Sequence, residues 1–159
     1  MVDKALFSSV TDEWSTPESL YNQLCNVYQF DLDPCASKDN AKCVKYFTKE
    51  DDGLSKIWWE HSEVVFVNPP HSGIVEWSLK CYEESLSGIT IVMLLASRTD
   101  TRYFHRYISK ADTLYFISGR LHFNDSKNSA PFPSVLAVFN NIKPYPVLDG
   151  MLGYNKING

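Results

Sequence analysis

The sequence predicts a single compact α/β domain whose sheet is mostly parallel and flanked by helices. Apolar, largely β-branched runs of strand length occupy residues 64–67, 89–95, 113–117 and 135–139. Segments with apolar residues at helical spacing lie between the first three runs. A chain of 159 residues is long enough for one hydrophobic core and short for two domains. Strands and crossover helices are therefore expected to share one sheet.

The N-terminal third is expected to contribute one helix and two short strands. A hydroxyl residue, a proline and an acid at Ser15-Thr16-Pro17-Glu18 are typical of a helix start. Residues 30–33 form the first expected strand, which Pro34 ends, and residues 46–48 form the second. An acidic turn that contains a glycine follows at residues 49–55.

The remainder of the chain alternates strands with helices. The amphipathic pattern at residues 74–86 predicts a helix that ends before Gly88, and a second helix is expected at residues 101–108. The continuous apolar run at residues 89–95 is typical of a strand covered on both faces. We divide the chain into a leader at residues 1–12, one domain at residues 13–143 and an irregular tail at residues 144–159.

Composition restricts the class of protein. The apolar and charged fractions, 44% and 21%, are ordinary for a soluble globular protein. Neither an apolar stretch of membrane-spanning length nor a signal-peptide pattern is present, so we expect a cytoplasmic protein with no membrane partner. The net charge of −4 disfavours a protein that coats nucleic acid. The four cysteines lack the spacing of a zinc site.

Charge is distributed unevenly along the chain. Acidic residues concentrate before residue 63, and basic residues gather in the second half. Such a cluster is either a solvated helix face or a track for phosphate groups, and both interpretations stay open at this point. The basic residues concerned are Lys80, Arg98, Arg102, Arg106, Lys110 and Arg120.

The most informative segment is the turn Asn68-Pro69-Pro70-His71, which directly follows the buried run at residues 64–67. Neither proline has an N–H group, and Pro70 restricts Pro69 to an extended conformation. The carbonyl groups of Asn68 and Pro69 are therefore not committed to a sheet or a helix. Because ligands of open α/β sheets bind at the carboxyl ends of strands, this turn can hold a planar group that carries an NH2.

Methyl transfer to an exocyclic amine matches this turn chemically. The lone pair of such an amine is delocalised into its ring, so the amine is a poor nucleophile. The Asn68 side-chain oxygen and a backbone carbonyl can both accept hydrogen bonds from the NH2 and stabilise the positive charge that develops on it. A ring beside the prolines can stack on the base. The alternative is a proline-containing loop that merely ends a strand.

Beyond the turn, the chain resembles the amino-methyltransferases, and most closely the small phage-type DNA N6-adenine (Dam-like) methyltransferases. The resemblance covers nearly the whole chain after the leader. Its blocks occur in the family's order, at residues 14–17, 30–33, 36–37, 46–54, 58, 68–70, 98–101, 119–121, 123 and 132–134.

The resemblance implies a Rossmann-like, S-adenosylmethionine-dependent methyltransferase fold that acts on double-stranded DNA, in the host cytoplasm if a phage encodes it. It implies no metal. The implied catalytic residues are Asn68, Pro69, Pro70 and His71. The implied cofactor-binding residues are Trp14, Thr16, Pro17, Asp33, Ala36, Ser37, Asp52, Leu54 and Asn68. The implied substrate-binding residues are His71, Arg98, Arg102, Arg120 and Phe123.

The chain departs from the family pattern at two places. His71 replaces a larger aromatic ring, and residues 33–37 replace a glycine-rich cofactor loop. Three alternatives stay open: the same chemistry on an RNA base or on a protein glutamine amide, a cofactor- or DNA-binding module without turnover, and a nuclease-type carboxylate set. Thr16 has a structural alternative as a helix cap, and Phe123 has one as a core residue. That carboxylate set would consist of Asp31, Asp33, Asp51 and Asp52.

Overall fold

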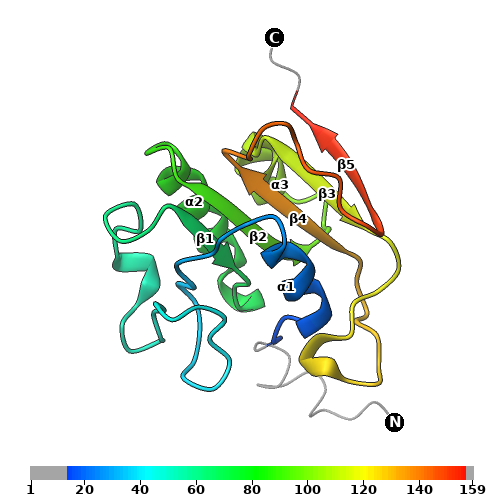
Figure 1. Ribbon diagram of the computed structural model, residues 1–159, viewed down its shortest axis with the longest axis horizontal. Coiled ribbons are helices and arrows are strands. Elements are labelled where there is room, and N and C mark those ends of the chain that lie inside the picture. The colour runs from blue at the N-terminus through cyan, green and yellow to red at the C-terminus, as the bar shows by residue number, and fades with distance from the viewer. Residues whose placement is uncertain (1–13, 157–159) are drawn as a thin grey trace.

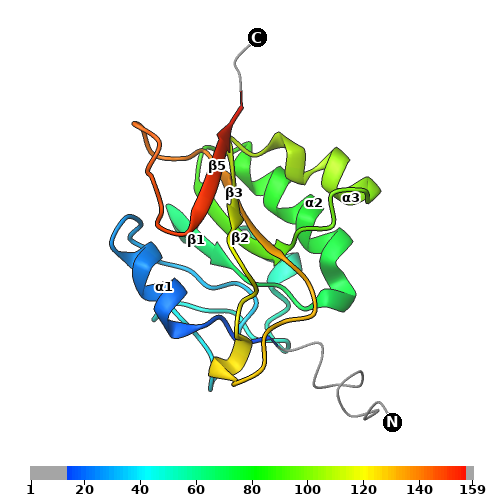
Figure 2. The ribbon, with the colours of Figure 1, turned by 90° about the vertical axis from the view of Figure 1, so that its right-hand side faces the viewer.

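The computed structural model describes residues 14–156, which form one sheet between two helical layers (Figures 1 and 2). Helices α2 (Ile74–Ser85) and α3 (Arg102–Arg106) cover one face of the sheet, and α1 (Glu18–Cys25) covers the other. The leader at residues 1–12 lies outside the described residues. None of the helices between residues 14 and 156 is long and apolar enough to cross a membrane.

The sheet has five strands in the order β1-β2-β4-β3-β5. The strands are β1 (Val64–Val67), β2 (Thr90–Ala96), β3 (Thr113–Ile117), β4 (Ser134–Phe139) and β5 (Met151–Asn155). Four of them match the strands predicted from the apolar runs. The prediction of a mostly parallel sheet is wrong, because among the named strands only β1 and β2 pair in parallel.

The reason for the antiparallel pairs lies in the connections. A parallel neighbour requires a long crossover, which is usually an α-helix. The segments after β3 and β4 contain no α-helix in the described structure; the first holds only the short 3-10 helix Phe123–Asp125. The segment after β3 therefore returns the chain as β4, antiparallel to β3. The segment after β4 instead passes β3 and places β5, which runs in the same direction as β4, on the far side of β3. Strands β1, β2 and β3 still run in one direction, so their carboxyl ends share one edge of the sheet.

The two short strands expected in the N-terminal third are reduced to single parallel bridges. Leu32 pairs with Val65 beside β1, and Asp33 pairs with Tyr46. The Asp31 carboxylate accepts hydrogen bonds from the backbone N–H groups of Glu63 and Val64, at 2.9 and 3.2 Å. These contacts fix residues 31–33 against the outer edge of β1, with Asp33 at the carboxyl end.

The helices match the predicted segments with small changes. Helix α1 begins after Pro17, so Thr16 is not its cap residue. The Asp125 carboxylate, from the loop after β3, accepts the N–H of Glu18 in the first turn at 3.4 Å. Helix α2 ends one residue earlier than predicted. The second predicted helix divides into α3 and a 3-10 turn at Ile108–Lys110.

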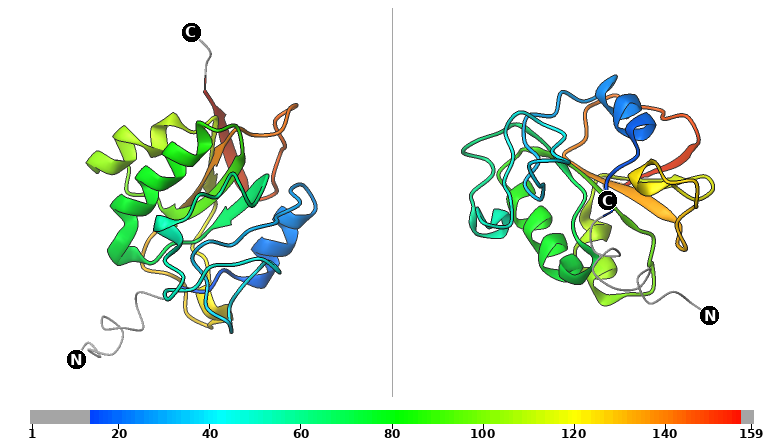
Figure 3. Two further views of the ribbon diagram at one scale, coloured as in Figure 1. Left: turned by 90° about the vertical axis from the view of Figure 1, so that its left-hand side faces the viewer. Right: turned by 90° about the horizontal axis from the view of Figure 1, so that it is seen from below.

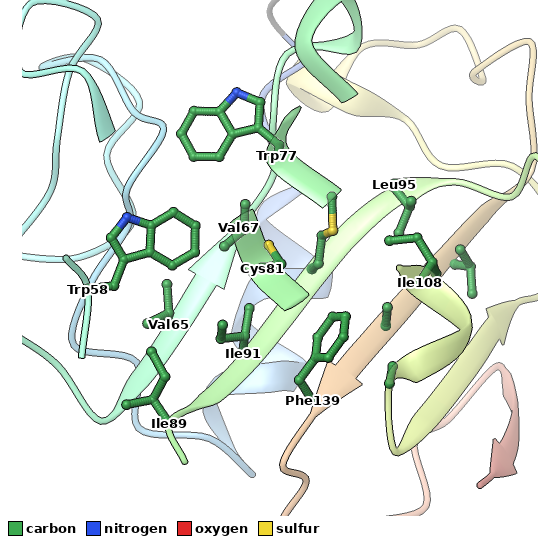
Figure 4. Packing of buried hydrophobic residues seen from close by; sticks show 14 of the residues in the cluster. Trp58, Val65, Val67, Trp77, Cys81, Ile89, Ile91, Leu95, Ile108 and Phe139 are labelled. Atoms are coloured by element: carbon green, nitrogen blue, oxygen red, sulfur yellow. The ribbon is translucent and has the colours of Figure 1, made fainter. Parts of the chain in front are cut away.

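The continuous apolar run in β2 is explained by burial on both faces of the sheet. Ile91, Met93 and Leu95 pack toward α2 and α3, whereas Val92 and Leu94 pack toward α1. The apolar residues thus form two cores, one on each face of the sheet. Figure 4 shows the core between the sheet and helices α2 and α3, which also contains Trp58, Val65, Val67, Trp77, Cys81, Ile108 and Phe139.

The tail contains a strand, contrary to the expectation that it is irregular. Residues Met151–Asn155 pair antiparallel with β3 and form the outer edge of the sheet. A Cβ atom at Gly153 would lie 3.0 Å from the Tyr115 ring, so the glycine lets β5 pass close over that side chain. Leu152 and Tyr154 remain exposed, which explains why the segment lacks the apolar pattern of a buried strand.

Candidate active site

The predicted site residues collect at the edge where β1, β2 and β3 end. Asn68 follows β1, Arg98 lies just after β2, and Arg120 follows β3 at the same edge. Figure 3, in the view from below, shows the segment before α1 beside the loop that connects β3 to β4. Reciprocal hydrogen bonds join these two segments: Ser15 N–H donates to Asn124 Oδ1 at 2.8 Å, and Asn124 N–H donates to the Ser15 carbonyl at 2.9 Å.

A cleft of about 470 Å³ opens at this edge, beside Asn68. This volume is within the usual range of small-molecule sites. Eight of the predicted cofactor residues line the cleft: Trp14, Thr16, Asp33, Ala36, Ser37, Asp52, Leu54 and Asn68. Pro17 instead lies buried at the start of α1, outside the lining.

Asp33 forms a buried acidic point in the cleft wall and is only 5% exposed. Its carboxylate accepts the backbone N–H of Lys42 at 3.1 Å, and the backbone N–H of Cys35 also donates to it. Burial raises the pKa of Asp33 to about 6, because the charged form loses solvation that these two donors restore only in part. The group therefore carries its charge at neutral pH and loses it in mildly acidic solution.

The acidic turn is held against the cleft by close backbone contact at Gly53. A Cβ atom at this position would lie 2.0 Å from the Pro34 carbonyl oxygen, so only glycine fits. The indole N–H of Trp58 donates to the Gly53 carbonyl at 2.9 Å, and Trp58 stacks on Trp77 at a ring-centroid distance of 6.0 Å. The neighbouring Asp52 has a φ of 55° and presents an exposed side chain at the cleft.

The Asn68 side chain is oriented through its nitrogen. Its Nδ2 donates to the carbonyl of Trp14 and to Thr16 Oγ1, the latter at 2.9 Å. Both acceptors belong to the segment before α1, so the cap-like sequence there serves the turn after β1. With the nitrogen held on this side, the amide oxygen points the other way.

Four rings, which we term the ring cluster, lie beside the turn: Trp14, His71, Phe123 and Phe132. Trp14 stacks parallel to His71, with an interplanar angle of 6° and a centroid distance of 5.5 Å. Phe123 and Phe132 meet Trp14 edge-on, at 5.4 and 5.5 Å. His71 meets Phe132 edge-on at 5.0 Å. The cluster brings together predicted residues from both halves of the chain.

The sequence model of one family matches residues 4–147, and that family is described as DNA N-6-adenine-methyltransferase (Dam). The chain belongs to this family. The match extends over the leader, the cleft, the turn and the ring cluster, so the site geometry lies within the matched region. It confirms the resemblance that the ordered sequence blocks indicated.

Named relatives agree with the family assignment. The chain is 32% identical over 114 residues to the DNA N-6-adenine-methyltransferase of Escherichia phage T1, a match that covers 71% of this chain and 48% of the relative. It is 28% identical over 144 residues to the DNA N-6-adenine-methyltransferase of Haemophilus phage HP1, covering 84% and 82%. It also matches the putative methyltransferase YfdM of Escherichia coli, at 36% identity over 67 residues. The chain thus spans about half the length of the phage T1 relative.

Three of the basic residues are predicted to contact phosphate groups of the substrate. Arg98, Arg102 and Arg120 are exposed. The Arg98 guanidinium lies 5.9 Å from the centre of the Phe132 ring and so adjoins the ring cluster. Arg102 begins α3, and Arg120 lies in the loop after β3. All three are placed near the carboxyl edge of the sheet, outside the cleft lining.

The nuclease-type carboxylate set is not assembled. Asp31 is engaged by backbone N–H groups, and Asp51 accepts hydrogen bonds from the Thr48 N–H and hydroxyl groups, at 2.9 and 3.1 Å. Within residues 14–156, no group of three or more His, Cys, Asp or Glu side chains is placed to hold a metal ion.

Sequence reasoning missed several residues of the site. Trp77, Lys42 and Cys35 line the cleft, and Phe132 belongs to the ring cluster. Trp77 lies on the apolar face of its helix and packs in the core as well as in the cleft wall. The available signal was its position on the first α-helix after the Asn68-Pro69-Pro70-His71 turn. Phe132 lies in one of the matched blocks, which could have indicated its importance.

Proposed function

We propose that this protein transfers a methyl group from S-adenosylmethionine to the exocyclic amine of an adenine that has left the DNA duplex. The observation that carries the proposal is the orientation of Asn68 at the edge of the cleft. Two acceptors hold its amide nitrogen, and the amide oxygen is thereby directed away from them. Membership of a family described by adenine N-6 methylation supports adenine in DNA as the acceptor.

The cleft residues suit S-adenosylmethionine. When bound, this cofactor supplies a methyl group on a positively charged sulfur. The buried carboxylate of Asp33 would accept hydrogen bonds from its amino group, and the exposed Asp52 would accept them from a hydroxyl group. Leu54 and Trp77 provide apolar surface for a planar ring. Gly53 keeps this wall close to the strand end.

Asn68 and the prolines act by electrostatic preorganisation. The Asn68 oxygen accepts a hydrogen bond from the target amine and opposes the positive charge that grows on it. A backbone carbonyl accepts the second hydrogen of the amine. The Pro70 carbonyl already accepts the Gly73 N–H at 3.2 Å, so this second acceptor is the carbonyl of Asn68 or Pro69. No proton abstraction by a side chain is required before methyl transfer: the N–C bond would form as the C–S bond of the donor breaks, and the methylated amine would then lose its extra proton to water.

The amine of a paired adenine lies inside the duplex, so the base must rotate out to reach the turn. His71 and Phe123 would contact the extruded base in the ring cluster. Arg98, Arg102 and Arg120 would contact phosphates. The relatives from phages T1 and HP1 are DNA N-6-adenine-methyltransferases, which favours DNA over RNA or a protein amide as the methyl acceptor. We place this activity in the cytoplasm, of the host where a phage encodes the protein.

The proposal is tested by digesting DNA from cells that express the protein and measuring N6-methyladenine by mass spectrometry. The host strain should lack its own adenine methyltransferases. Cells that express Asn68→Ala at the same level provide the matched control. We expect N6-methyladenine with the wild-type protein and a strong reduction with the variant. Cofactor binding without N6-methyladenine would favour a binding module instead.

A further inference from the structure

Trp14 occupies an unusual position for a residue before a helix. It lines the cleft and is also the central ring of the ring cluster, where it contacts His71, Phe123 and Phe132. Trp14 therefore occupies the junction of the two halves of the proposed site.

The contacts of the indole are those that a bound base would make. One face stacks on the ring that follows the two prolines, at an interplanar angle of 6°. Two phenylalanine rings meet it edge-on, at 84° and 69°. Indole and purine are both planar, fused two-ring systems of nine ring atoms. A purine thus has the shape that these three walls already enclose.

The indole nitrogen of Trp14 lacks a hydrogen-bond acceptor among residues 14–156. This nitrogen, Nε1, is buried. A buried donor without an acceptor is costly, because it has lost water and gained nothing in return. Rotation of the indole out toward solvent would give this N–H a water molecule as its acceptor.

We propose that the indole of Trp14 fills the seat of the target purine and that an extruded adenine displaces it. This inference rests on the proposed function. The walls of the seat are His71, Phe123 and Phe132, with Arg98 behind Phe132.

The backbone around Trp14 can stay in place while the side chain leaves. The Trp14 carbonyl accepts a hydrogen bond from Asn68 Nδ2. The Ser15 backbone forms two hydrogen bonds with Asn124, one to its side-chain oxygen and one from its backbone N–H. Displacement therefore needs only rotation of the side chain about its own bonds. The anchored carbonyl keeps the Asn68 amide oriented after the base has entered.

The test is fluorine NMR of protein labelled with 5-fluorotryptophan. Four resonances are expected from Trp14, Trp58, Trp59 and Trp77, and Trp14→Phe identifies the relevant one. The duplex probe carries a sequence that the wild-type protein is found to methylate. A second duplex has an abasic site in place of the target adenine. The H2O/D2O isotope shift of each resonance reports exposure to solvent, and the 49% exposed Trp59 gives the reference for an open indole.

We expect the adenine duplex to move the Trp14 resonance to the exposed reference and the abasic duplex to leave it buried. Trp77, in the cleft wall, should respond to cofactor and not to the duplex. If the Trp14 resonance stays buried on a duplex that becomes methylated, the displacement of Trp14 by adenine is overturned, and the proposed function stands. Absence of methylation on any sequence would overturn the proposed function and the seat with it.

Binding measurements give an independent check. When only a fraction of the molecules has an open seat, the apparent affinity is the intrinsic affinity multiplied by that fraction. Removing the occupant raises the apparent affinity by the reciprocal of the fraction, so Trp14→Ala should bind the adenine duplex at least about threefold more tightly. Its affinity for the abasic duplex should not change. Trp59→Ala is the control, and it should match wild type on both duplexes. Weaker binding of the adenine duplex by Trp14→Ala, in protein that still binds cofactor, would make the indole a wall of the seat and overturn the inference.

Discussion

The amide nitrogen of Asn68 lies 2.9 Å from the hydroxyl oxygen of Thr16, to which it donates a hydrogen bond. The contact joins the end of β1 to the segment that starts α1, across 52 residues of sequence. It fixes which end of the amide faces the proposed reaction. The first prediction follows from this relationship.

Asn68→Ala should lower the rate of methyl transfer strongly, by about 2 to 4 kcal/mol of transition-state stabilisation, as when one preorganised partner is lost. Affinity for the cofactor should fall far less, because the cleft has many other lining residues. Single-turnover methylation and calorimetry measure the two quantities separately. A variant that retained most of its rate would contradict the proposed role.

Thr16 supplies a matched control for this prediction. Thr16→Val keeps the shape of the buried side chain and removes the hydroxyl acceptor. The Asn68 amide then loses one hydrogen bond that orients it, which contributes about 1 kcal/mol. Thr16→Ser keeps the acceptor. We expect the rate to fall in the valine variant and to be retained in the serine variant. Equal rates in the two variants would show that the hydroxyl does not position Asn68.

Cofactor binding should depend on pH through Asp33. The pKa of this buried carboxyl is raised to about 6, so the charged form that binds an amino group predominates above pH 6 and is lost below it. Affinity for S-adenosylmethionine should be constant at high pH and then fall by up to about tenfold per pH unit below 6. Asp33→Asn should bind more weakly at pH 8 and show a flat profile. A wild-type profile that stays level down to pH 5, measured by calorimetry, would remove Asp33 from the cofactor site.

The raised pKa of Asp33 affects folding stability in the opposite direction to cofactor affinity: stability falls as the pH rises. Because the pKa of Asp33 is higher in the folded protein than in the unfolded chain, its contribution to stability is present below pH 4 and is lost as pH rises through about 6.

Gly53→Ala should weaken cofactor binding by displacing the acidic turn. The added Cβ would lie 2.0 Å from the Pro34 carbonyl, so the backbone must move, with a loss of about 1 to 3 kcal/mol in stability. Gly88→Ala is the comparison, since Gly88 has a φ of 92° and open space around its Cβ. Thermal unfolding should detect destabilisation in both variants. Only Gly53→Ala should lower cofactor affinity, and an equal effect of Gly88→Ala would indicate general destabilisation.

DNA affinity should depend on the basic residues at the carboxyl edge. Replacing Arg98, Arg102 and Arg120 by alanine should reduce the slope of log affinity against log salt by about one unit for each lost phosphate contact. The neighbouring exposed residues Arg106 and Lys110 serve as a double-alanine control of equal type. Fluorescence anisotropy at several salt concentrations measures the slope. If the triple and control variants share the wild-type slope, the arginines form a solvated face.

Most of the secondary-structure elements of this protein can be predicted from its sequence. Four apolar runs became β1 to β4, and the helical spacing after the turn became α2, because periodicity reports which faces of a segment are buried. The character of the turn Asn68-Pro69-Pro70 could also be predicted from sequence. A proline fixes its own φ, lacks an N–H group and restricts the residue before it to an extended conformation in any fold. These features depend on adjacent residues alone.

The direction of β4, the formation of β5 and the composition of the site depend on the tertiary structure. Strand direction depends on where a connection returns, and β5 owes its place to pairing with β3. Trp77 enters the cleft wall, and Trp14 meets His71 and Phe132, because separate segments end at one edge of the sheet. Contacts between residues so far apart in sequence leave no periodic trace, so the ring cluster and the held nitrogen of Asn68 became visible only in three dimensions.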